Sequence, residues 1–200
     1  MEQIETKRTV MKRFSLSDAV NIFELNNDPE VVRYTGDKAF SDIAEARDFL
    51  AHYNPYDLYG YGRMSVFLKD TGTYLGWCGL RFQPDQGFTD IGFRFKQAYW
   101  NRGFATETAL ATLQWGFETA RLPFIVGRAQ TANLASIQVL KKCGMHFWKN
   151  GTCSAEPAIY LKLDAPAPPA FQKQEVIACN LAKWRKMTTF EMLNWNTCNL

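Results

Sequence analysis

Three strand-like runs in the middle of the chain constrain its fold more than any other feature. They are RMSVFLKD at 63–70, YLGWCGLRF at 74–82 and TDIGFRFK at 89–96, and they are rich in residues that favour strands. Turn signals separate them, DTG at 70–72 and PDQG at 84–87. Short connections join neighbouring antiparallel strands, so these runs predict an antiparallel meander.

A long helix is predicted to follow this meander, over 104–120. Its apolar residues recur at the spacing of one helix face; they are Ala105, Ala109, Leu113, Gly116, Phe117 and Ala120. Shorter helices are predicted from Ser17 and Asp18 to about Asn26, from Ser41 or Asp42 onward, and over 133–143. The second of these is predicted to have an apolar face of Ile43, Ala46, Phe49 and Leu50.

Four further strands complete the predicted sheet, at 8–14, 124–130, 145–149 and 158–163. Asn150-Gly151 is a turn signal between the last two strands, and NPYDLYGYG at 54–62 is predicted to be a loop. Strands and helices alternate only in the second half of the chain. This order favours an α/β fold with a mixed, mostly antiparallel central sheet flanked by helices.

Composition limits the classes of function. With 200 residues, 46% of them hydrophobic, the chain can bury one full core. The net charge is +3 and the 23 Lys and Arg residues are scattered, which argues against nucleic acid as a partner. Five cysteines without a C-x-x-C motif, beside only two histidines, predict buried thiols in a reducing cytosol and no metal site.

The two ends of the chain carry separate predictions. The start, MEQIETKRTV, has no apolar signal core and no stretch reaches the apolar length of a membrane span, so we expect a cytoplasmic protein without a membrane partner. DAPAPPA at 164–170 is predicted to be a Pro-rich linker. Beyond it, 171–200 form a C-terminal extension with roughly helical spacing of apolar residues, which would dock on the core, fill a partner's groove or be disordered.

The stretch YWNRGFATE at 99–107 places an arginine and a glycine at the start of the predicted long helix. The first turn of a helix has backbone N–H groups without an intrahelical partner and the positive end of the helix dipole, so it can bind a phosphate. Gly103 leaves the approach open and lets several N–H groups point to one place, and Arg102 adds charge. The alternative is that Gly103 is only a turn glycine.

Five segments, taken in order, carry a resemblance to a known family. They are TKRTVMKRFSLSDA, NNDPEVVRY, TDIGFRF, YWNRGFATE and NLASIQVLKKCGM. These segments occur in an order similar to that in the GNAT superfamily of acyl-CoA N-acyltransferases. The chain most resembles the subgroup with the ribosomal-protein N-terminal acetyltransferases. The resemblance covers residues 6–163. The resemblance implies a GNAT-like domain over 1–163 that transfers an acetyl group from acetyl-CoA to a primary amine without a metal.

The resemblance also implies a cosubstrate site. In the family, backbone amides at the start of the long helix hold the coenzyme A pyrophosphate. This role falls on Arg102, Gly103, Phe104, Ala105 and Thr106. The preceding strand pairs with the pantetheine arm, which implies Phe93 and Phe95, whose side chains are equally suited to the core. Trp100 stands where the general family pattern has Gln or Arg, although an aromatic residue at this position resembles the subgroup.

Acetyl transfer needs a neutral amine, a polarised carbonyl and a proton for the leaving thiolate. Asp90 occupies the position of the family's acidic residue, more often Glu, which commonly acts as a base through water; its alternative role is an N–H acceptor or a partner of Arg94. Ser136 matches the subgroup serine that meets the sulfur, or is a capping hydroxyl, while Leu140 replaces the tyrosine donor of many relatives. Asn133 is predicted to cap the same helix and to line the cosubstrate site.

The acceptor amine is predicted to attack the thioester directly, since no histidine is expected near Cys78 or Cys143 to activate a thiol. The groove that binds the acceptor amine is expected over 26–62, where aromatic and acidic residues would suit a cationic amine. They are Tyr34, Tyr53, Tyr56, Tyr59, Tyr61, Asp28, Glu30, Asp37 and Asp57. A small molecule and a protein N-terminus both stay open as acceptors, and so does a homodimer. A second class of function stays open too: a catalytically weak acyl-CoA-binding or protein-interaction module.

Overall fold

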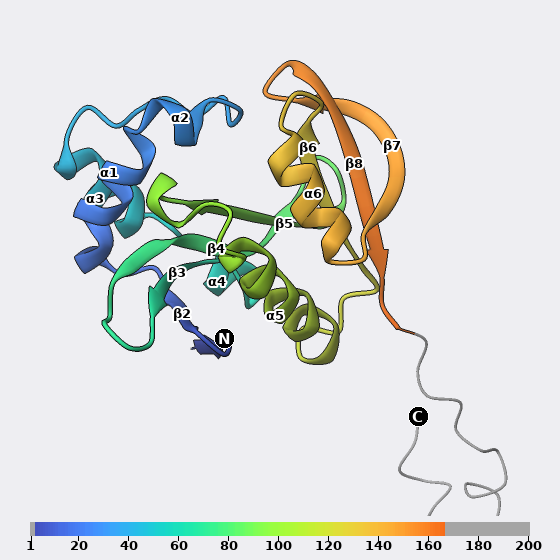
Figure 1. Cartoon of the computed structure of the whole chain (residues 1–200), viewed down its shortest axis with the longest axis horizontal. Helices are drawn as coiled ribbons and strands as arrows, with labels where there is room; N and C mark the ends of the chain where they lie inside the picture. Colours follow the sequence, from blue (N-terminus) through green and yellow to red (C-terminus); the bar gives the residue numbers. More distant parts are fainter. Residues whose placement is uncertain (1–2, 167–200) are drawn as a thin grey trace, which may run out of the picture. The chain divides into compact units, whose positions relative to one another are not determined.

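An eight-stranded sheet is the centre of the fold. The computed structural model describes residues 3–166, whose strands are arranged in the order β1-β2-β3-β4-β5-β6-β8-β7 (Figure 1). The strands are β1 (Gln3–Glu5), β2 (Thr9–Arg13), β3 (Arg63–Leu68), β4 (Tyr74–Gln83), β5 (Phe88–Phe95), β6 (Phe124–Gln130), β7 (His146–Cys153) and β8 (Glu156–Asp164). The helices are α1 (Ala19–Asn26), α2 (Pro29–Val32), α3 (Ile43–Ala51), α4 (Pro55–Tyr59), α5 (Phe104–Glu118) and α6 (Leu134–Lys142).

The predicted fold class is confirmed. Among the described strands β5 and β6 form the one parallel pair, and the others pair antiparallel. The predicted meander is confirmed as well, because β3, β4 and β5 are successive antiparallel neighbours. The sheet is therefore mixed and mostly antiparallel, with helices packed against it.

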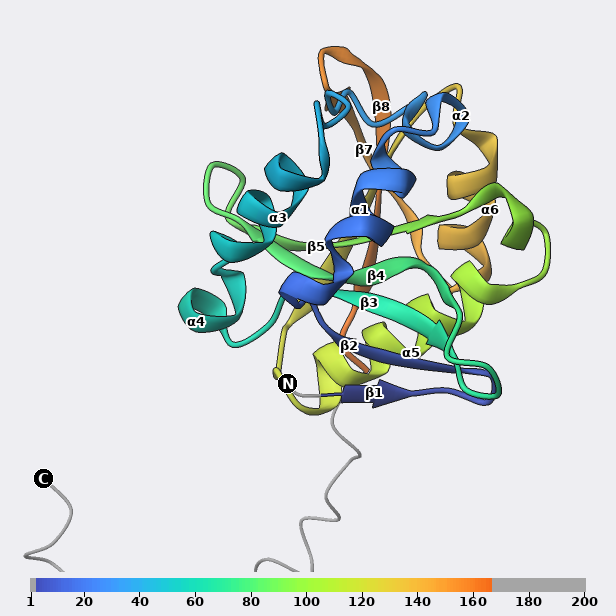
Figure 2. The same ribbon diagram turned by 90° about the vertical axis from the view of Figure 1, so that its left-hand side faces the viewer.

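Strand β4 separates two hydrophobic layers. Leu75 and Cys78 belong to the core that includes the apolar side chains of α5 and α6, whereas Tyr74 and Trp77 belong to a second cluster with α1 and α3. Figure 2 brings α1 and α3 in front of the sheet. Successive strand residues point to opposite faces, and the shift in register between β3 and β4 at Val66 and Phe67 adds one residue to β4, which puts Leu75 and Cys78 on the same face. One strand therefore supplies both layers, and helices cover the sheet on its two sides.

Strands β5 and β6 diverge after a short pairing. Asp90 pairs with Val126 and Ile91 with Gly127, and the ladder stops there. On its other edge β5 stays paired with β4 as far as Phe95. Within residues 3–166 the backbone of 92–95 therefore has no strand partner on the β6 side. Figure 1 shows β5 running away from β6 and β8.

Helix α5 buries a face that differs in part from the predicted one. Of the predicted apolar positions, the buried ones are Ala109, Leu113 and Gly116. Thr108 and Thr112 are also fully buried, and sequence periodicity missed them because threonine counts as polar. Thr108 Oγ1 donates to the Phe104 carbonyl at 2.9 Å, so its hydroxyl has a partner within the helix.

Helix α3 begins as predicted, because the Asp42 carboxylate accepts from the Glu45 amide as an N-cap. Its predicted apolar face is only half right. Ala46 and Leu50 are buried, whereas Ile43 and Phe49 are 43% and 42% exposed. Phe49 lies at the edge of the helix layer, where its ring contacts other aromatic rings.

The prediction of a loop over 54–62 is wrong, since this stretch contains α4. Pro55 stands at the first turn of this helix, and Gly60 ends it with a φ of 77°. Proline at the start and a left-handed glycine at the end are the signals of a short helix.

The predicted turn at Asn150-Gly151 is also wrong. Both residues lie inside β7, and the chain turns at Ser154 and Ala155, where φ is 53° and 66°. A Cβ on Gly151 would lie 2.7 Å from the ring of Tyr160. Glycine is therefore needed there for close packing against the neighbouring strand rather than for a turn.

The C-terminal predictions fall mostly outside the described residues. Of the predicted linker over 164–170, Asp164 is the last residue of β8, and the extension over 171–200 lies beyond the described range. Within 3–166 no helix has the length and apolar character needed to cross a membrane.

Candidate active site

Two cavities meet above the divergent strands. The large cavity, of about 820 Å³, is lined by β5 and by the beginnings of α5 and α6. The small cavity, of about 600 Å³, is lined by β4, β5, β6 and the segment around 34–40. The residues that line both are Tyr34, Thr35, Phe93, Arg94, Asn133 and Ser136. A group at this junction is in reach of molecules in either cavity.

The large cavity ends on the first turn of α5. Gly103 precedes the helix with a φ of 80°, a conformation that glycine adopts without strain. The first intrahelical bond runs from the Glu107 amide to the Gly103 carbonyl, so the amides of 104–106 have no acceptor within the helix. Gly103, Phe104, Ala105 and Thr106 all line this cavity.

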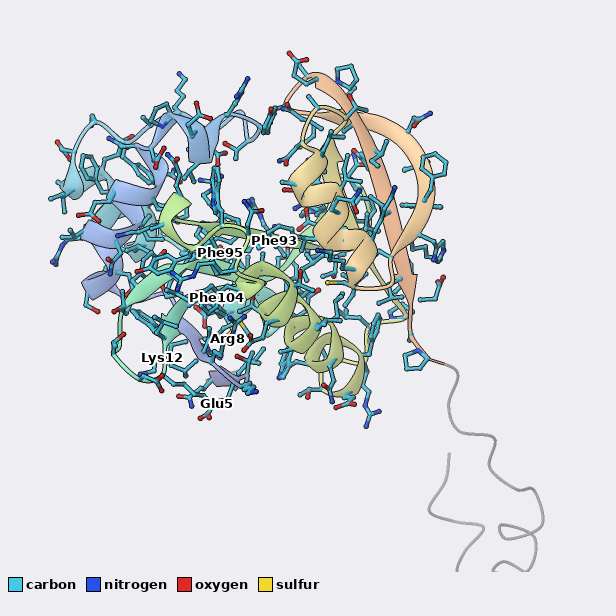
Figure 3. The ribbon with its side chains drawn as sticks, viewed as in Figure 1. Glu5, Arg8, Lys12, Phe93, Phe95 and Phe104 are labelled. Atoms are coloured by element: carbon cyan, nitrogen blue, oxygen red, sulfur yellow. The ribbon has the colours of Figure 1, made fainter. Side chains whose placement is uncertain are left out.

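Arg8 makes three contacts that stabilise this first turn of α5. Its guanidinium lies 4.1 Å from the centre of the Phe104 ring, donates to the Arg102 carbonyl at 3.0 Å and pairs with Glu107 at 2.7 Å. Figure 3 shows Arg8 and Phe104 next to each other, with Phe93 and Phe95 on β5 above them. Sequence reasoning missed Arg8, whose role depends on contact between distant segments.

Glu107 is the carboxylate that forms the ion pair with Arg8. Burial raises its pKa, but hydrogen bonds from Thr6 and from the Arg8 amide and side chain outweigh burial and lower the pKa below its usual value. The Thr6 hydroxyl donates to the carboxylate at 2.6 Å and the Arg8 amide at 2.8 Å. An ionised carboxylate therefore fixes the β1–β2 turn to α5.

Of the predicted cosubstrate residues, Arg102 alone does not line the large cavity. Its guanidinium lies over the rings of Tyr99 and Phe104, each about 5.9 Å away. Phe93 and Phe95 line the cavity, and they lie in the part of β5 that β6 does not pair with. Free backbone N–H and C=O groups at such an edge can pair with an extended ligand that contains amides.

Asn133 caps α6, as predicted, because its side-chain oxygen accepts from the Ser136 amide at 3.1 Å. The Ser136 hydroxyl has no hydrogen-bond partner within 3–166, so it does not act as a cap. It lies at the junction of the two cavities. Leu140, one turn further along, is 2% exposed. Ser136 is thus the hydroxyl of α6 that can reach a ligand.

Asp90 lies on the wall of the small cavity with its side chain only 5% exposed. Arg63 Nη2 donates to Oδ1 at 2.8 Å, and Arg128 Nη2 donates to Oδ2 at 2.5 Å. Gln83 adds a third donor at 3.1 Å. The alternative pairing with Arg94 is wrong, since that arginine binds Asp37 and Asn26 instead. Both oxygens of Asp90 are therefore occupied by donors.

Sequence reasoning missed Arg63 and Arg128. The one local signal is Gly92, where a Cβ would lie 2.7 Å from the Arg63 guanidinium, so the glycine makes room for this side chain. Burial lowers the pKa of Arg128, but the Asp90 carboxylate outweighs burial and raises the pKa above its usual value. The two arginines and Asp90 form one charged cluster, in which the cations outnumber the carboxylate.

The predicted acceptor segment supplies fewer free groups than expected. The Tyr53 hydroxyl accepts from the Arg63 amide at 2.7 Å, and the Tyr56 hydroxyl accepts from the Phe14 amide at 2.9 Å. Burial raises the pKa of both tyrosines. Asp28 caps α2 and accepts from Gln97. These side chains support the backbone around the site.

A hydrogen bond joins the two sides of the small cavity. The Ser154 hydroxyl, at the tip of the β7–β8 hairpin, donates to the Thr35 carbonyl at 2.6 Å. Gly36, with a φ of 71°, lies against the same side chain, and a Cβ there would be 2.2 Å from Ser154 Cβ. Thr35 and Ser154 both line the small cavity, so this contact restricts access to it from that side.

The buried thiols of Cys78 and Cys143, which line neither cavity, are poor nucleophiles. Burial raises the pKa of Cys78, and burial together with the neighbouring Cys78 raises the pKa of Cys143 to about 12. Within the described range no group of three or more His, Cys, Asp or Glu side chains is arranged to hold a metal ion. The residues that line the site can bind an anion at α5, pair with amides at β5 and donate a proton from Ser136.

Comparison with known proteins decides the family. The sequence model of the acetyltransferase (GNAT) domain matches residues 8–146. The chain belongs to the GNAT acetyltransferases. The uncharacterised N-acetyltransferase p20 of Bacillus licheniformis is 30% identical over 153 residues, which cover 76% of this chain and 85% of that protein.

Solved GNAT structures share the fold at low identity. Ribosomal-protein-S5-alanine acetyltransferase from Vibrio fischeri has a TM-score of 0.71 at 14% identity, over 84% of this chain and 98% of that one. Spermidine N-acetyltransferase from Vibrio cholerae, in complex with CoA and spermine, has a TM-score of 0.67 at 14% identity, over 78% of this chain and 95% of that one.

This GNAT acetyltransferase uses acetyl-CoA, and it transfers the acetyl group to an amine. The expectation of an acyl-CoA-dependent N-acetyltransferase is confirmed, and the alternative of a weak binding or interaction module is not favoured. The site fits this cosubstrate. The start of α5 offers amides without an intrahelical acceptor to a pyrophosphate, and the edge of β5 that β6 leaves open suits an arm that contains amides.

Proposed function

We propose that the large cavity binds acetyl-CoA and that the small cavity admits the acceptor amine, either a small molecule or a protein N-terminus. The observation that carries this proposal is the junction of the two cavities, where Phe93, Arg94 and Ser136 line both. The thioester would lie at this junction, so an amine could reach it from the opposite side. The cytoplasmic location and the homodimer stay predictions.

The start of α5 would hold the pyrophosphate through the amides of 104–106. Gly103 keeps the turn in its left-handed conformation, and the helix dipole adds a favourable field for the anion. Arg102 would contribute charge from outside the cavity. Arg8 is proposed as a positioning residue for this turn, because it binds the Arg102 carbonyl, the Phe104 ring and Glu107.

The backbone at Phe93 and Phe95 would pair with the pantetheine arm, since β6 does not pair with this part of β5. The Phe95 side chain is 4% exposed and belongs to the core. Both proposed roles are compatible, because the backbone binds the ligand while the ring packs below. Asn133 would border the same arm and keep α6 in place as its cap.

Ser136 is proposed to donate its hydroxyl proton toward the thiolate, or to stabilise the oxyanion, as the amine displaces coenzyme A. Its hydroxyl is free of partners within 3–166 and lies at the junction. The amine would attack the carbonyl directly. Burial raises the pKa of the Cys78 and Cys143 thiols, which disfavours an acyl-enzyme on either of them.

Asp90 as a base that acts through water remains a prediction. Its two oxygens already accept from Arg63, Arg128 and Gln83, so its better supported role is to position these arginines on the wall of the acceptor cavity. The effect of Asp90→Asn on the pH profile separates the two roles.

Calorimetric titration with acetyl-CoA tests the proposed site. Gly103→Ala should weaken binding about tenfold, since a side chain in the left-handed conformation costs about 1 to 2 kcal/mol and displaces the turn. The matched control is Gly72→Ala, because Gly72 also has a positive φ of 68° and no atom within 4 Å of a new Cβ. Equal affinities of native protein and both variants would refute the assignment of the pyrophosphate to α5.

A further inference from the structure

The small cavity carries an excess of positive charge. Its basic lining residues are Lys38, Arg63, Arg81, Arg94 and Arg128. Its carboxylates are Asp37 and Asp90. Five cations against two anions leave three positive charges in a cleft of about 600 Å³. A second cation placed in such a cleft would be repelled, and an anion would be attracted.

The ion pairs within the cavity do not remove this excess. Arg94 is neutralised by Asp37 at 2.5 Å. Arg63 and Arg128 share the single carboxylate of Asp90, so one of their charges is uncompensated. Their side chains are 13% and 21% exposed, which limits screening by solvent. Largely buried cations of this kind are suited to bind a ligand anion.

Lys38 and Arg81 supply the other two positive charges. Both side chains are exposed, and neither has an ion pair within the described part of the chain. Arg81 lies opposite Asp90 in the ladder between β4 and β5, next to the cluster with Arg63 and Arg128. The free cations therefore come from at least two elements that face one cleft.

We propose that the acceptor is a small anionic amine, a molecule that carries a carboxylate or phosphate besides its primary amino group. This inference rests on the proposed use of the small cavity by the acceptor. The anion would bind near Arg63, Arg81 and Arg128, and the amino group would point to the junction at Ser136. A small molecule fits better than a chain terminus, because the Ser154–Thr35 hydrogen bond restricts access to the cavity.

The strand geometry sets the length of this molecule. The charged cluster lies at Asp90 and the junction at Phe93 and Arg94, three to four residues further along β5. At about 3.3 Å per residue this corresponds to roughly 10 to 13 Å between backbone positions, which the long arginine side chains shorten. A spacer of several bonds between amine and anion therefore suits the cavity better than the single carbon of an α-amino acid.

Matched pairs of amines test the inference. The full-length protein is assayed with acetyl-CoA and with ω-amino acids of increasing length, each compared with its carboxamide, and with phosphoethanolamine compared with ethanolamine. The anionic member of the best pair should have a kcat/KM at least about tenfold higher, as expected for a charge-assisted contact. Spermidine, a polycation, should be a poor acceptor.

Two variants connect the preference to the cavity. Arg81→Glu should lower or reverse the preference for the anionic member, chiefly through KM, and Lys38→Gln should lower it less. Neither should change the affinity for acetyl-CoA, measured by calorimetry. The control is Arg47→Gln, an exposed arginine of α3 that lines neither cavity.

The outcomes separate this inference from the proposed function. Acetylation of amides or spermidine in preference to anionic amines would overturn the inference and leave the proposed function intact. Acetylation of a peptide N-terminus, and of none of the small amines, would also overturn the inference and leave the proposed function intact. If no amine is acetylated, the proposed function fails, and calorimetry with the longest ω-amino acid and its amide, at a saturating concentration of CoA, still decides whether the cavity selects an anion.

Discussion

The ion pair between Asp90 and Arg128, 2.5 Å apart, spans the point at which β5 and β6 separate. The last paired positions of these strands are Ile91 and Gly127, and Arg128 is the next residue on β6. The pair therefore ties together two strands just before they diverge to border the two cavities. Support of the strand junction and orientation of the cationic wall depend on the same carboxylate.

We expect Asp90→Asn to lower the free energy of unfolding by about 3 kcal/mol, because it leaves two partly buried arginines without a carboxylate. Urea denaturation measures this change. The control is Asp48→Asn, whose side chain is 73% exposed and pairs with His52 on the surface; its effect should stay below about 0.5 kcal/mol. Equal effects of the two substitutions would contradict the structural role of Asp90.

The same variant decides between a positioning role and a catalytic base. If Asp90 positions the arginines, Asp90→Asn should raise the KM for the acceptor and keep the shape of the profile of kcat against pH. If Asp90 is the base, kcat should fall and the limb of the profile that depends on the catalytic base should disappear. We expect the first result.

Ser136→Ala should lower kcat about tenfold to a hundredfold, because the transition state loses a hydrogen-bond donor at the departing thiolate or the oxyanion. Calorimetry should give an unchanged affinity for acetyl-CoA. Ser136→Thr, which keeps the hydroxyl, should recover part of the activity. A variant with alanine at this position that retains full kcat would exclude Ser136 from the chemistry.

Glu107 should make stability depend on pH in the acid range. Its pKa in the folded state lies below the usual value of about 4.5, so its contribution is fully present above that value and is lost as pH falls through the folded pKa. Thermal unfolding of Glu107→Gln should show a lower Tm at pH 7 and a smaller loss of Tm below pH 4.5 than the native protein. Glu118→Gln, at the exposed end of α5, is the control and should follow the native curve.

Direct attack by the amine predicts sequential kinetics. Plots of reciprocal rate against reciprocal acetyl-CoA concentration, at several acceptor concentrations, should intersect rather than run parallel. Cys78 and Cys143 should also react slowly with iodoacetamide at pH 8, because burial raises the pKa of both thiols, and peptide mapping can follow each one. Parallel lines together with an acetylated cysteine would indicate a covalent intermediate instead.

The sequence predicted those site residues whose roles depend only on residues nearby in the chain. Gly103 at a helix start and Asn133 as an N-cap act through their own backbone or through residues three positions away. Arg63 and Arg128 could not be found in this way. They meet Asp90 only because the four neighbouring strands β3, β4, β5 and β6 pair in one particular register. The only trace in the sequence is the absence of a side chain at Gly92.

The prediction of a turn at Asn150-Gly151 is wrong for a related reason. The dipeptide is a strong hairpin signal, but the ring of Tyr160 on β8 occupies the space that a side chain on Gly151 would need. A contact across the sheet therefore decided which role this glycine has. Sequence pattern alone does not distinguish a glycine that turns the chain from one that admits a neighbouring ring.

The divergence of β5 from β6 has a consequence for the protein in a cell. In the part of the chain that the structure describes, four residues of a central strand, 92–95, keep one edge without a strand beside it. If acetyl-CoA lies along this edge as proposed, the ligand completes the sheet as an added strand would. Part of the folding free energy would then be supplied by a metabolite, and the Tm should rise with the concentration of CoA by mass action. The supply of the cosubstrate would thus influence how long the enzyme survives as well as how fast it works.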